Sequence, residues 1–164
     1  MRLEYFQLVD RIVTLDLDGG TVKTHAKVPP ANTIFEGHFP GHPLMPGVLL
    51  IEAMAQTSGW LIIGLTKFER VAILAAVKDA KLRSYVTPGQ DLVISAQLVH
   101  AGSGFTMTRA AIEANGKIVA ESDLTFRQVP FPHPRFRKGM ELVAANIGFP
   151  GYGHDGAALP GTAA

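Results

Sequence analysis

The segment from Val48 to Leu65 constrains the fold more than any other part of the chain, because it is long and apolar and holds a single charged side chain, that of Glu52. Its length alone would suit a membrane span. An ionisable group is costly in lipid, however, and the polar residues Gln56, Thr57 and Ser58 follow it. We therefore expect no membrane span, but a helix that is buried by protein on nearly all sides.

The overall composition favours one well-packed domain. The chain has 164 residues, of which 47% are hydrophobic and 18% charged, which excludes a disordered chain and favours extensive burial, including burial in an oligomer. The net charge of +1 gives no basic footprint for nucleic acid. Because the chain has no cysteine, disulfides, thiolate metal sites and a cysteine nucleophile are excluded. Glu4 interrupts the N-terminal segment where a signal peptide is apolar, so we expect a cytoplasmic protein.

Runs that are typical of strands lie on both sides of the apolar helix. We expect strands over Gln7–Leu17, Thr21–Val28, Arg70–Ala80, Asp91–Ala101, Phe105–Ala114 and Lys117–Arg127. Asn115-Gly116 predicts a tight hairpin turn, and the proline-rich stretch Pro29–Met45 predicts a loop before a helix that opens at Pro46. The expected class is α+β, with an antiparallel sheet wrapped around one long central helix. Such a core is thin, which predicts pairing with a second copy.

The composition changes after residue 129, so we divide the chain into a domain over residues 1–129 and a C-terminal extension over residues 130–164. The extension is rich in proline and glycine. A short helix is expected near Lys138–Ile147, and the last fifteen or so residues are expected to be disordered.

Three residues between Phe35 and Gln56 point to chemistry. His38 lies on a loop stiffened by prolines, Gly47 lies in the first helical turn, and Glu52 lies five residues further along. A histidine can act as a base near neutral pH, and free N–H groups at a helix start can hold a carbonyl oxygen that gains negative charge. A carboxylic acid among apolar neighbours can protonate a departing hydroxyl. Together these groups suit removal of a proton next to a carbonyl with expulsion of a nearby hydroxyl.

Two other patterns are rejected. His38 and His42 have the spacing of a helical metal-binding pair, but Pro40 and Pro43 prevent the helix that would align them. The glycines of residues 151–156 match a dinucleotide-binding pattern, but no strand precedes them and the chain ends soon afterwards. No metal and no cofactor are therefore expected.

The segment Gly37–Gln56, which includes Gly-His-Phe-Pro and Met-Pro-Gly-Val-Leu, resembles the signature of the FabZ-type 3-hydroxyacyl-(acyl-carrier-protein) dehydratases, a hot-dog fold family. The likeness extends over roughly residues 5–127. It implies that His38 abstracts the C2 proton, that Glu52 handles the C3 hydroxyl and that the Gly47 N–H polarises the thioester carbonyl. The resemblance also places Phe39, Val48 and Gln56 at substrate-binding positions.

The same resemblance implies the partners. The substrate would be an acyl chain linked through phosphopantetheine to an acyl carrier protein, and the enzyme would be a homodimer or a hexamer built as a trimer of dimers. Each site would take its histidine from one subunit and its glutamate from the other. An acidic carrier would need a basic docking surface. Candidates are Lys78, Lys81, Arg83, Arg135, Arg137 and Lys138, for each of which an ordinary solvated position is an equal alternative. Phe35, Phe39, Leu44 and Trp60 would line an acyl tunnel or belong to the core.

Some features depart from the family pattern. The usual Pro-His-Arg-Tyr-Pro run is missing, Tyr85 and Gln90 replace a common proline and aspartate, and the C-terminal extension is longer. They suggest a paralogue for long or unusual acyl chains, such as those of lipid A. Two rivals to a dehydratase stay open. One is a hot-dog thioesterase, which would not need His38, and the other is a non-catalytic acyl- or carrier-binding subunit.

Overall fold

The computed structural model describes residues 1–152, and its centre is a six-stranded antiparallel sheet. The strand order is β1-β2-β4-β5-β6-β3, so the chain crosses the whole sheet between the second and third strands. The strands are β1 Arg11–Asp16, β2 Thr21–Lys27, β3 Arg70–Leu82, β4 Asp91–Gly102, β5 Phe105–Ala114 and β6 Lys117–Pro130. Each expected strand is confirmed, although the first begins later than Gln7.

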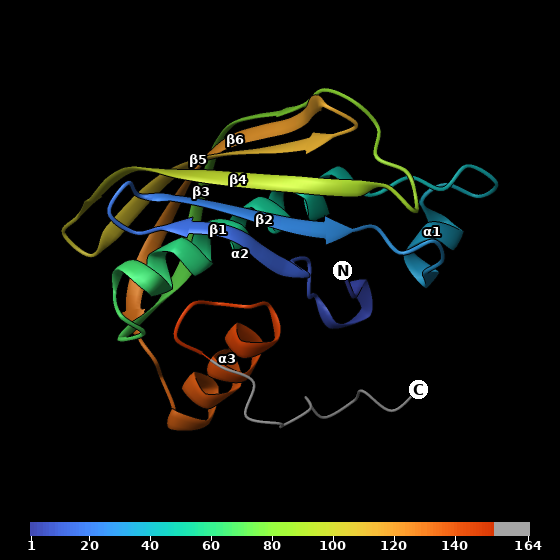
Figure 1. Ribbon diagram of the computed structural model, residues 1–164. Helices are drawn as coiled ribbons and strands as arrows, with labels where there is room; N and C mark the ends of the chain where they lie inside the picture. The colour runs from blue at the N-terminus through green and yellow to red at the C-terminus, as the bar shows by residue number, and fades with distance from the viewer. Residues whose placement is uncertain (153–164) are drawn as a thin grey trace.

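The long helix α2, Gly47–Leu65, makes the crossover and lies in the curve of the sheet (Figure 1). Its sheet-facing side contributes Leu50, Met54 and Leu61 to the main hydrophobic core. Within residues 1–152, α2 is the one helix long and apolar enough to cross a membrane, and 61% of its apolar window is buried inside the fold. That burial agrees with the expectation of a central core helix.

Two buried hydroxyl pairs join α2 to the sheet. Thr24 Oγ1 on β2 lies 2.8 Å from Thr57 Oγ1, and Thr108 Oγ1 on β5 lies 2.9 Å from Ser58 Oγ. All four side chains are buried. Because a buried hydroxyl needs a partner, these pairs help to fix the rotation of α2 about its axis and hence which of its faces meets the sheet.

A second, smaller core covers another side of α2. Helix α3, Pro134–Asn146, packs Ala144 and the residues that follow it against Trp60 and Ile63 of α2. The helix begins earlier than expected, because Pro134 suits the first turn and the His133 ring nitrogen accepts from the Arg135 N–H at 3.0 Å. The expectation of disorder over the last fifteen or so residues falls almost entirely outside the described residues.

The sequence predicted a loop over Pro29–Met45, but part of this stretch is helical. A one-turn helix, α1, spans Thr33–Gly37 and buries Phe35. It forms because the Asn32 side chain accepts from the Ile34 N–H at 3.1 Å and thereby caps the turn. A short 3-10 helix, η1, also spans Leu3–Tyr5. Helix α1 ends directly before His38, so it sets where the loop of that residue begins.

Candidate active site

The His38 ring is held in one orientation by its own loop. Its Nδ1 atom lies 3.0 Å from the carbonyl oxygen of Leu44. A carbonyl can only accept, so Nδ1 carries the proton in this hydrogen bond, and in the neutral ring Nε2 is then the nitrogen with the lone pair. Backbone bonds from the His38 N–H to the Ile34 oxygen (3.1 Å) and from the Leu44 N–H to the His38 oxygen (2.8 Å) fix the turn. The ring therefore presents Nε2 as a base.

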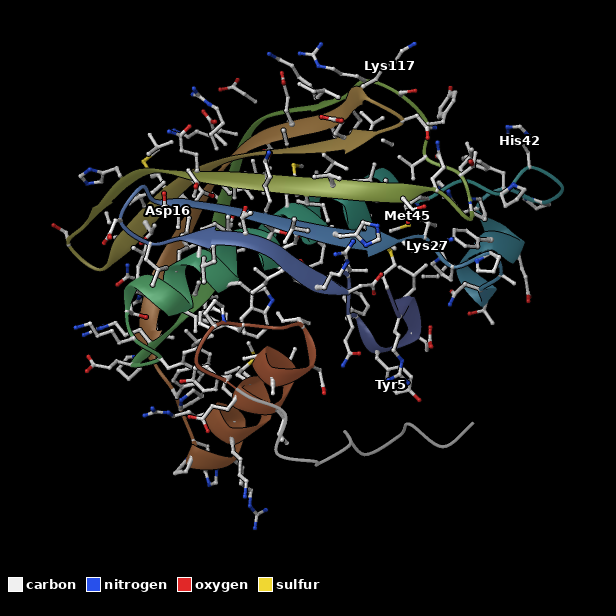
Figure 2. The ribbon with its side chains drawn as sticks, in the orientation of Figure 1. Tyr5, Asp16, Lys27, His42, Met45 and Lys117 are labelled. Carbon is white, nitrogen blue, oxygen red and sulfur yellow. The ribbon has the colours of Figure 1, made fainter. Side chains whose placement is uncertain are left out.

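Phe39 completes this loop. Its ring stacks on His38 with centroids 4.3 Å apart and planes at 27°. The backbones of Phe39 and His42 exchange two hydrogen bonds, of 3.1 and 2.9 Å. Phe39 is largely exposed, and the His42 side chain points away from the fold at the tip of the loop (Figure 2). Of the two histidines in this loop, His38 is thus the one directed at the rest of the protein.

Gly47 is the first residue of α2, after Pro46, which provides no side-chain cap. Among residues 1–152, no acceptor pairs with the Gly47 N–H or with the Val48 N–H. Unpaired N–H groups at a helix start are donors for an oxygen that bears negative charge. A Cβ added to Gly47 would overlap the end of the Leu82 side chain, so glycine also allows β3 to approach the helix start.

His38, Phe39 and Gly47 line one pocket of about 430 Å³. The other lining residues are Leu44, Met45, Leu50, Leu82, Arg83, Ser84, Tyr85 and Val86. Arg83 also lies 2.5 Å from the Glu121 carboxylate, and this hydrogen bond lowers the pKa of Glu121. The pocket thus brings a base, an unpaired donor and a cationic rim together.

Glu52 does not line this pocket. In an α-helix, five residues correspond to a rotation of about 140°, so Glu52 and Gly47 face different sides of α2. Val48, Glu52 and Gln56 follow each other at intervals of four and share one stripe of the helix. Val48 is 71% exposed there. The six site residues named from the sequence therefore fall into two groups. His38, Phe39 and Gly47 line the pocket, and Val48, Glu52 and Gln56 share the stripe on α2.

Gln56 positions Glu52. Its Nε2 donates to Glu52 Oε1 at 3.0 Å and to the Phe6 carbonyl at 2.7 Å, while its Oε1 accepts from the Leu8 N–H at 3.0 Å. These bonds tie the N-terminal segment to the middle of α2. They also leave the second carboxylate oxygen of Glu52 available for another partner. In the described part of the chain, no group of three or more His, Asp or Glu side chains is arranged to hold a metal ion.

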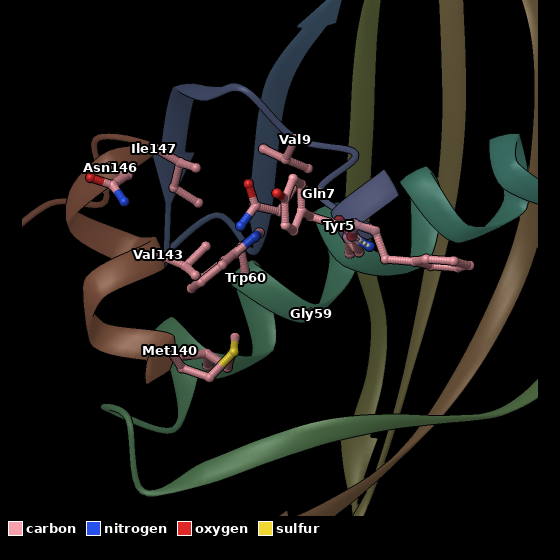
Figure 3. A pocket seen from close by; sticks show the side chains of 12 residues that line it. Tyr5, Gln7, Val9, Gly59, Trp60, Met140, Val143, Asn146 and Ile147 are labelled. Carbon is pink, nitrogen blue, oxygen red and sulfur yellow. Dashed lines mark hydrogen bonds between the residues drawn. The ribbon is translucent and has the colours of Figure 1, made fainter. Parts of the chain in front are cut away.

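A second pocket, of about 340 Å³, lies between α2, the N-terminal segment and α3 (Figure 3). Its lining residues are Tyr5, Phe6, Gln7, Val9, Gln56, Gly59, Trp60, Ile63, Met140, Val143, Asn146 and Ile147. No motif in the sequence pointed to this pocket. Trp60 is both buried in the smaller core and part of the lining, so its two proposed roles are compatible.

Comparison with known proteins decides the family. A family model described as a FabA-like domain matches residues 2–123. The 3-hydroxyacyl-(acyl-carrier-protein) dehydratase FabZ of Protochlamydia amoebophila is 37% identical over 121 residues, which cover 74% of this chain and 79% of the relative. The chain belongs to the FabZ-type dehydratases. Helix α3 lies beyond the part of the chain that the FabA-like family model matches.

Solved structures support the hot-dog fold of this FabZ-type chain. A conserved protein of Pseudomonas aeruginosa superposes with a TM-score of 0.60 at 24% identity, covering 76% of this chain and 93% of that one. A hypothetical thioesterase of Streptococcus pneumoniae, solved with coenzyme A, gives a TM-score of 0.56 at 18% identity, with 73% and 88% covered. At these identities the likeness concerns the fold alone.

Proposed function

We propose that this FabZ-type protein dehydrates (3R)-3-hydroxyacyl-(acyl carrier protein) to trans-2-enoyl-(acyl carrier protein) and water, in fatty acid biosynthesis. The observation that carries the proposal is the shared pocket of His38 and Gly47, which is lined both by a histidine whose Nδ1 is held by a carbonyl and by a helix start whose N–H has no acceptor among residues 1–152. The pair provides the two groups that ionisation next to a thioester carbonyl needs.

In the proposed reaction, the Gly47 N–H donates to the thioester oxygen and stabilises the charge that develops on it. His38 Nε2 removes the C2 proton, and the electron pair forms the C2–C3 double bond. The C3 hydroxyl leaves with a proton from the Glu52 carboxyl, which becomes a carboxylate while the imidazole becomes an imidazolium. Return of the proton from His38 to Glu52, directly or through solvent, resets the site. Phe39, Val48 and Gln56 would contact the substrate around these atoms.

We propose that the missing glutamate comes from a second copy of the chain. This accounts for Gly47 and Glu52 facing different sides of one helix. Strand β3 offers the surface for pairing, because among residues 1–152 it is an edge strand that pairs only with β6, and it leaves Ile73, Leu74 and Val77 exposed. A long apolar edge is a template for another strand. Light scattering distinguishes the homodimer from the hexamer that the resemblance implies.

The proposed partner is an acyl carrier protein in the cytoplasm. Carrier proteins are acidic, and Arg83 lies at the same pocket as His38 while Lys81 lies 3.5 Å from Glu121 nearby. These cations suit an acidic partner that delivers its acyl chain to the pocket. We further propose a preference for long or unusual acyl chains, of which lipid A chains are one class, because the C-terminal extension adds α3 beyond the family match.

The test is hydration of a crotonyl thioester, the reverse reaction. His38→Ala and Glu52→Gln should each lower kcat/KM at least about a hundredfold while the oligomer stays intact. His42→Ala is the matched control, because His42 is exposed at the tip of the same loop and should retain activity. Full activity in either site variant would refute the mechanism. Release of free thiol without hydration would support the thioesterase, and activity in neither assay would support the non-catalytic subunit.

A further inference from the structure

We propose that the pocket between α2 and α3 receives the distal part of the acyl chain, and that α3 sets the longest chain the enzyme processes. This inference rests on the proposed dehydratase function. It assigns a role to the C-terminal helix, which lies outside residues 2–123. It also assigns an occupant to the pocket, namely the unbranched hydrocarbon that continues beyond C3, the carbon whose hydroxyl Glu52 is proposed to protonate.

The lining of the pocket matches such an occupant. Trp60 comes from α2, Val9 from the N-terminal segment, and Met140 and Val143 from α3, so apolar side chains line the cavity from three segments (Figure 3). Phe6 and Ile63 also line it. The volume of about 340 Å³ lies in the range of small-molecule sites. A cavity of this size and polarity favours a hydrocarbon over a charged or sugar ligand.

Gln56 links the pocket to the proposed acid, Glu52, which does not itself line the pocket. Gln56 lines it and at the same time donates to Glu52 at 3.0 Å. Glu52, Gln56, Gly59 and Ile63 are spaced by four, three and four residues, so they form one stripe along α2. From Glu52 to Ile63 this stripe runs about 16 Å along the helix axis. An acyl chain whose third carbon lies at Glu52 would follow the stripe from its polar start to its apolar end.

Gly59 supports this path independently. A Cβ added at Gly59 would meet nothing within 4 Å, so packing inside the chain does not require glycine there. Glycine in the middle of a helix is less stable than alanine. What the glycine provides is space, because it leaves the floor of the pocket without a side chain between Gln56 and Ile63.

The α3 wall is firmly attached. Ala144 is buried, the Ile12 N–H of β1 donates to the Ile147 oxygen at 2.7 Å, and the Phe149 ring lies 6.0 Å from the ring of Trp60. A wall fixed to both the sheet and the central helix can limit the length of a ligand, whereas a loose segment would give way. The limit on chain length is therefore assigned to α3.

The experiment measures hydration of crotonyl, octenoyl, dodecenoyl and hexadecenoyl chains on one carrier protein. Val143→Trp fills the pocket from α3, and Gly59→Leu fills it from α2 with a good helix former. Leu142→Trp is the control, because it adds the same indole to α3 at a residue that does not line the pocket. Each methylene excluded from the pocket should lower kcat/KM about fourfold. Both pocket variants should therefore lower the ratio of hexadecenoyl to crotonyl kcat/KM at least tenfold, and Leu142→Trp should keep it within twofold.

The outcomes separate the two proposals. If the wild-type protein hydrates crotonyl carrier and neither pocket variant changes the ratio, the pocket assignment is overturned while the dehydratase function stands. If the wild-type protein hydrates no chain, the proposed function fails and the assignment fails with it. A changed ratio in Gly59→Leu alone, accompanied by dissociation in size-exclusion chromatography, would place Gly59 at a subunit contact and also overturn the assignment. Should Val143→Trp not fold, Met140→Trp tests the same wall.

Discussion

The Gln56 amide lies 3.0 Å from the Glu52 carboxylate and is bonded at the same time to the backbone of Phe6 and Leu8. One side chain thus links the N-terminal segment to the proposed acid. The first residues of the chain thereby contribute to holding Glu52, although the motif itself lies between Gly37 and Gln56. If this hydrogen bond holds Glu52 in the geometry that the reaction needs, its loss should lower kcat.

We predict that Gln56→Met lowers kcat for crotonyl hydration about tenfold with a smaller effect on KM, because a hydrogen bond to a charged group is worth about 1.5–3 kcal/mol. The same variant should also lower the free energy of unfolding. Gln128→Met is the control, since Gln128 donates to Thr106 outside both pockets. It should reduce stability without changing kcat. Equal losses of kcat in the two variants would contradict a positioning role for Gln56.

Subunit complementation tests the shared site. His38→Ala and Glu52→Gln homodimers should each be inactive, whereas co-expression of the two variants with different tags should restore activity. Random pairing gives heterodimers in half of the population, each with one intact site, so roughly one quarter of wild-type activity is expected. A site built within one chain would give no recovery. The doubly substituted chain co-expressed with wild-type provides the control for pairing itself.

The sequence predicted the strands and the central helix, because alternation and an apolar run are local signals. It also predicted that His38, Gly47 and Glu52 act together, and of these His38 and Gly47 line one pocket of the single chain while Glu52 does not. It did not predict α1, since a single turn among prolines looks like a loop, although Asn32 before Thr33 was a usable capping signal. The packing of Phe149 against Trp60 depends on contacts between distant parts of the chain. No local pattern encodes them, so the pocket between α2 and α3 could not be predicted.

The buried Thr24–Thr57 pair predicts a non-additive effect on stability. Both side chains are fully buried and their hydroxyl oxygens lie 2.8 Å apart. Thr57→Val should lower the free energy of unfolding by about 1–3 kcal/mol, because it leaves the Thr24 hydroxyl without this partner. Thr24→Val/Thr57→Val should recover most of the loss, since both polar groups are then gone. Urea unfolding of the wild-type protein, the two single variants and the double variant, at one protein concentration, measures these free energies. Additive losses of stability would show that the two hydroxyls do not interact.

Two glycines of α2 should respond to alanine in opposite directions. At Gly59 an added Cβ meets nothing within 4 Å, so Gly59→Ala should raise the free energy of unfolding by about 0.5–1 kcal/mol through the better helix propensity of alanine. At Gly64 the added Cβ would lie 2.8 Å from Leu17 Cδ2 and 3.1 Å from Phe149 Cζ. Gly64→Ala should therefore cost about 1–3 kcal/mol by overpacking.

Comparing Gly59→Ala with Gly64→Ala separates the effect of packing from that of helix propensity, because both glycines lie in α2 and undergo the same substitution. Thermal and urea unfolding of the two variants, at equal concentration, provide the comparison. A destabilised Gly59→Ala with an unchanged oligomer would mean that the space above Gly59 is already occupied in solution, which would also remove the open floor on which the acyl path along α2 depends.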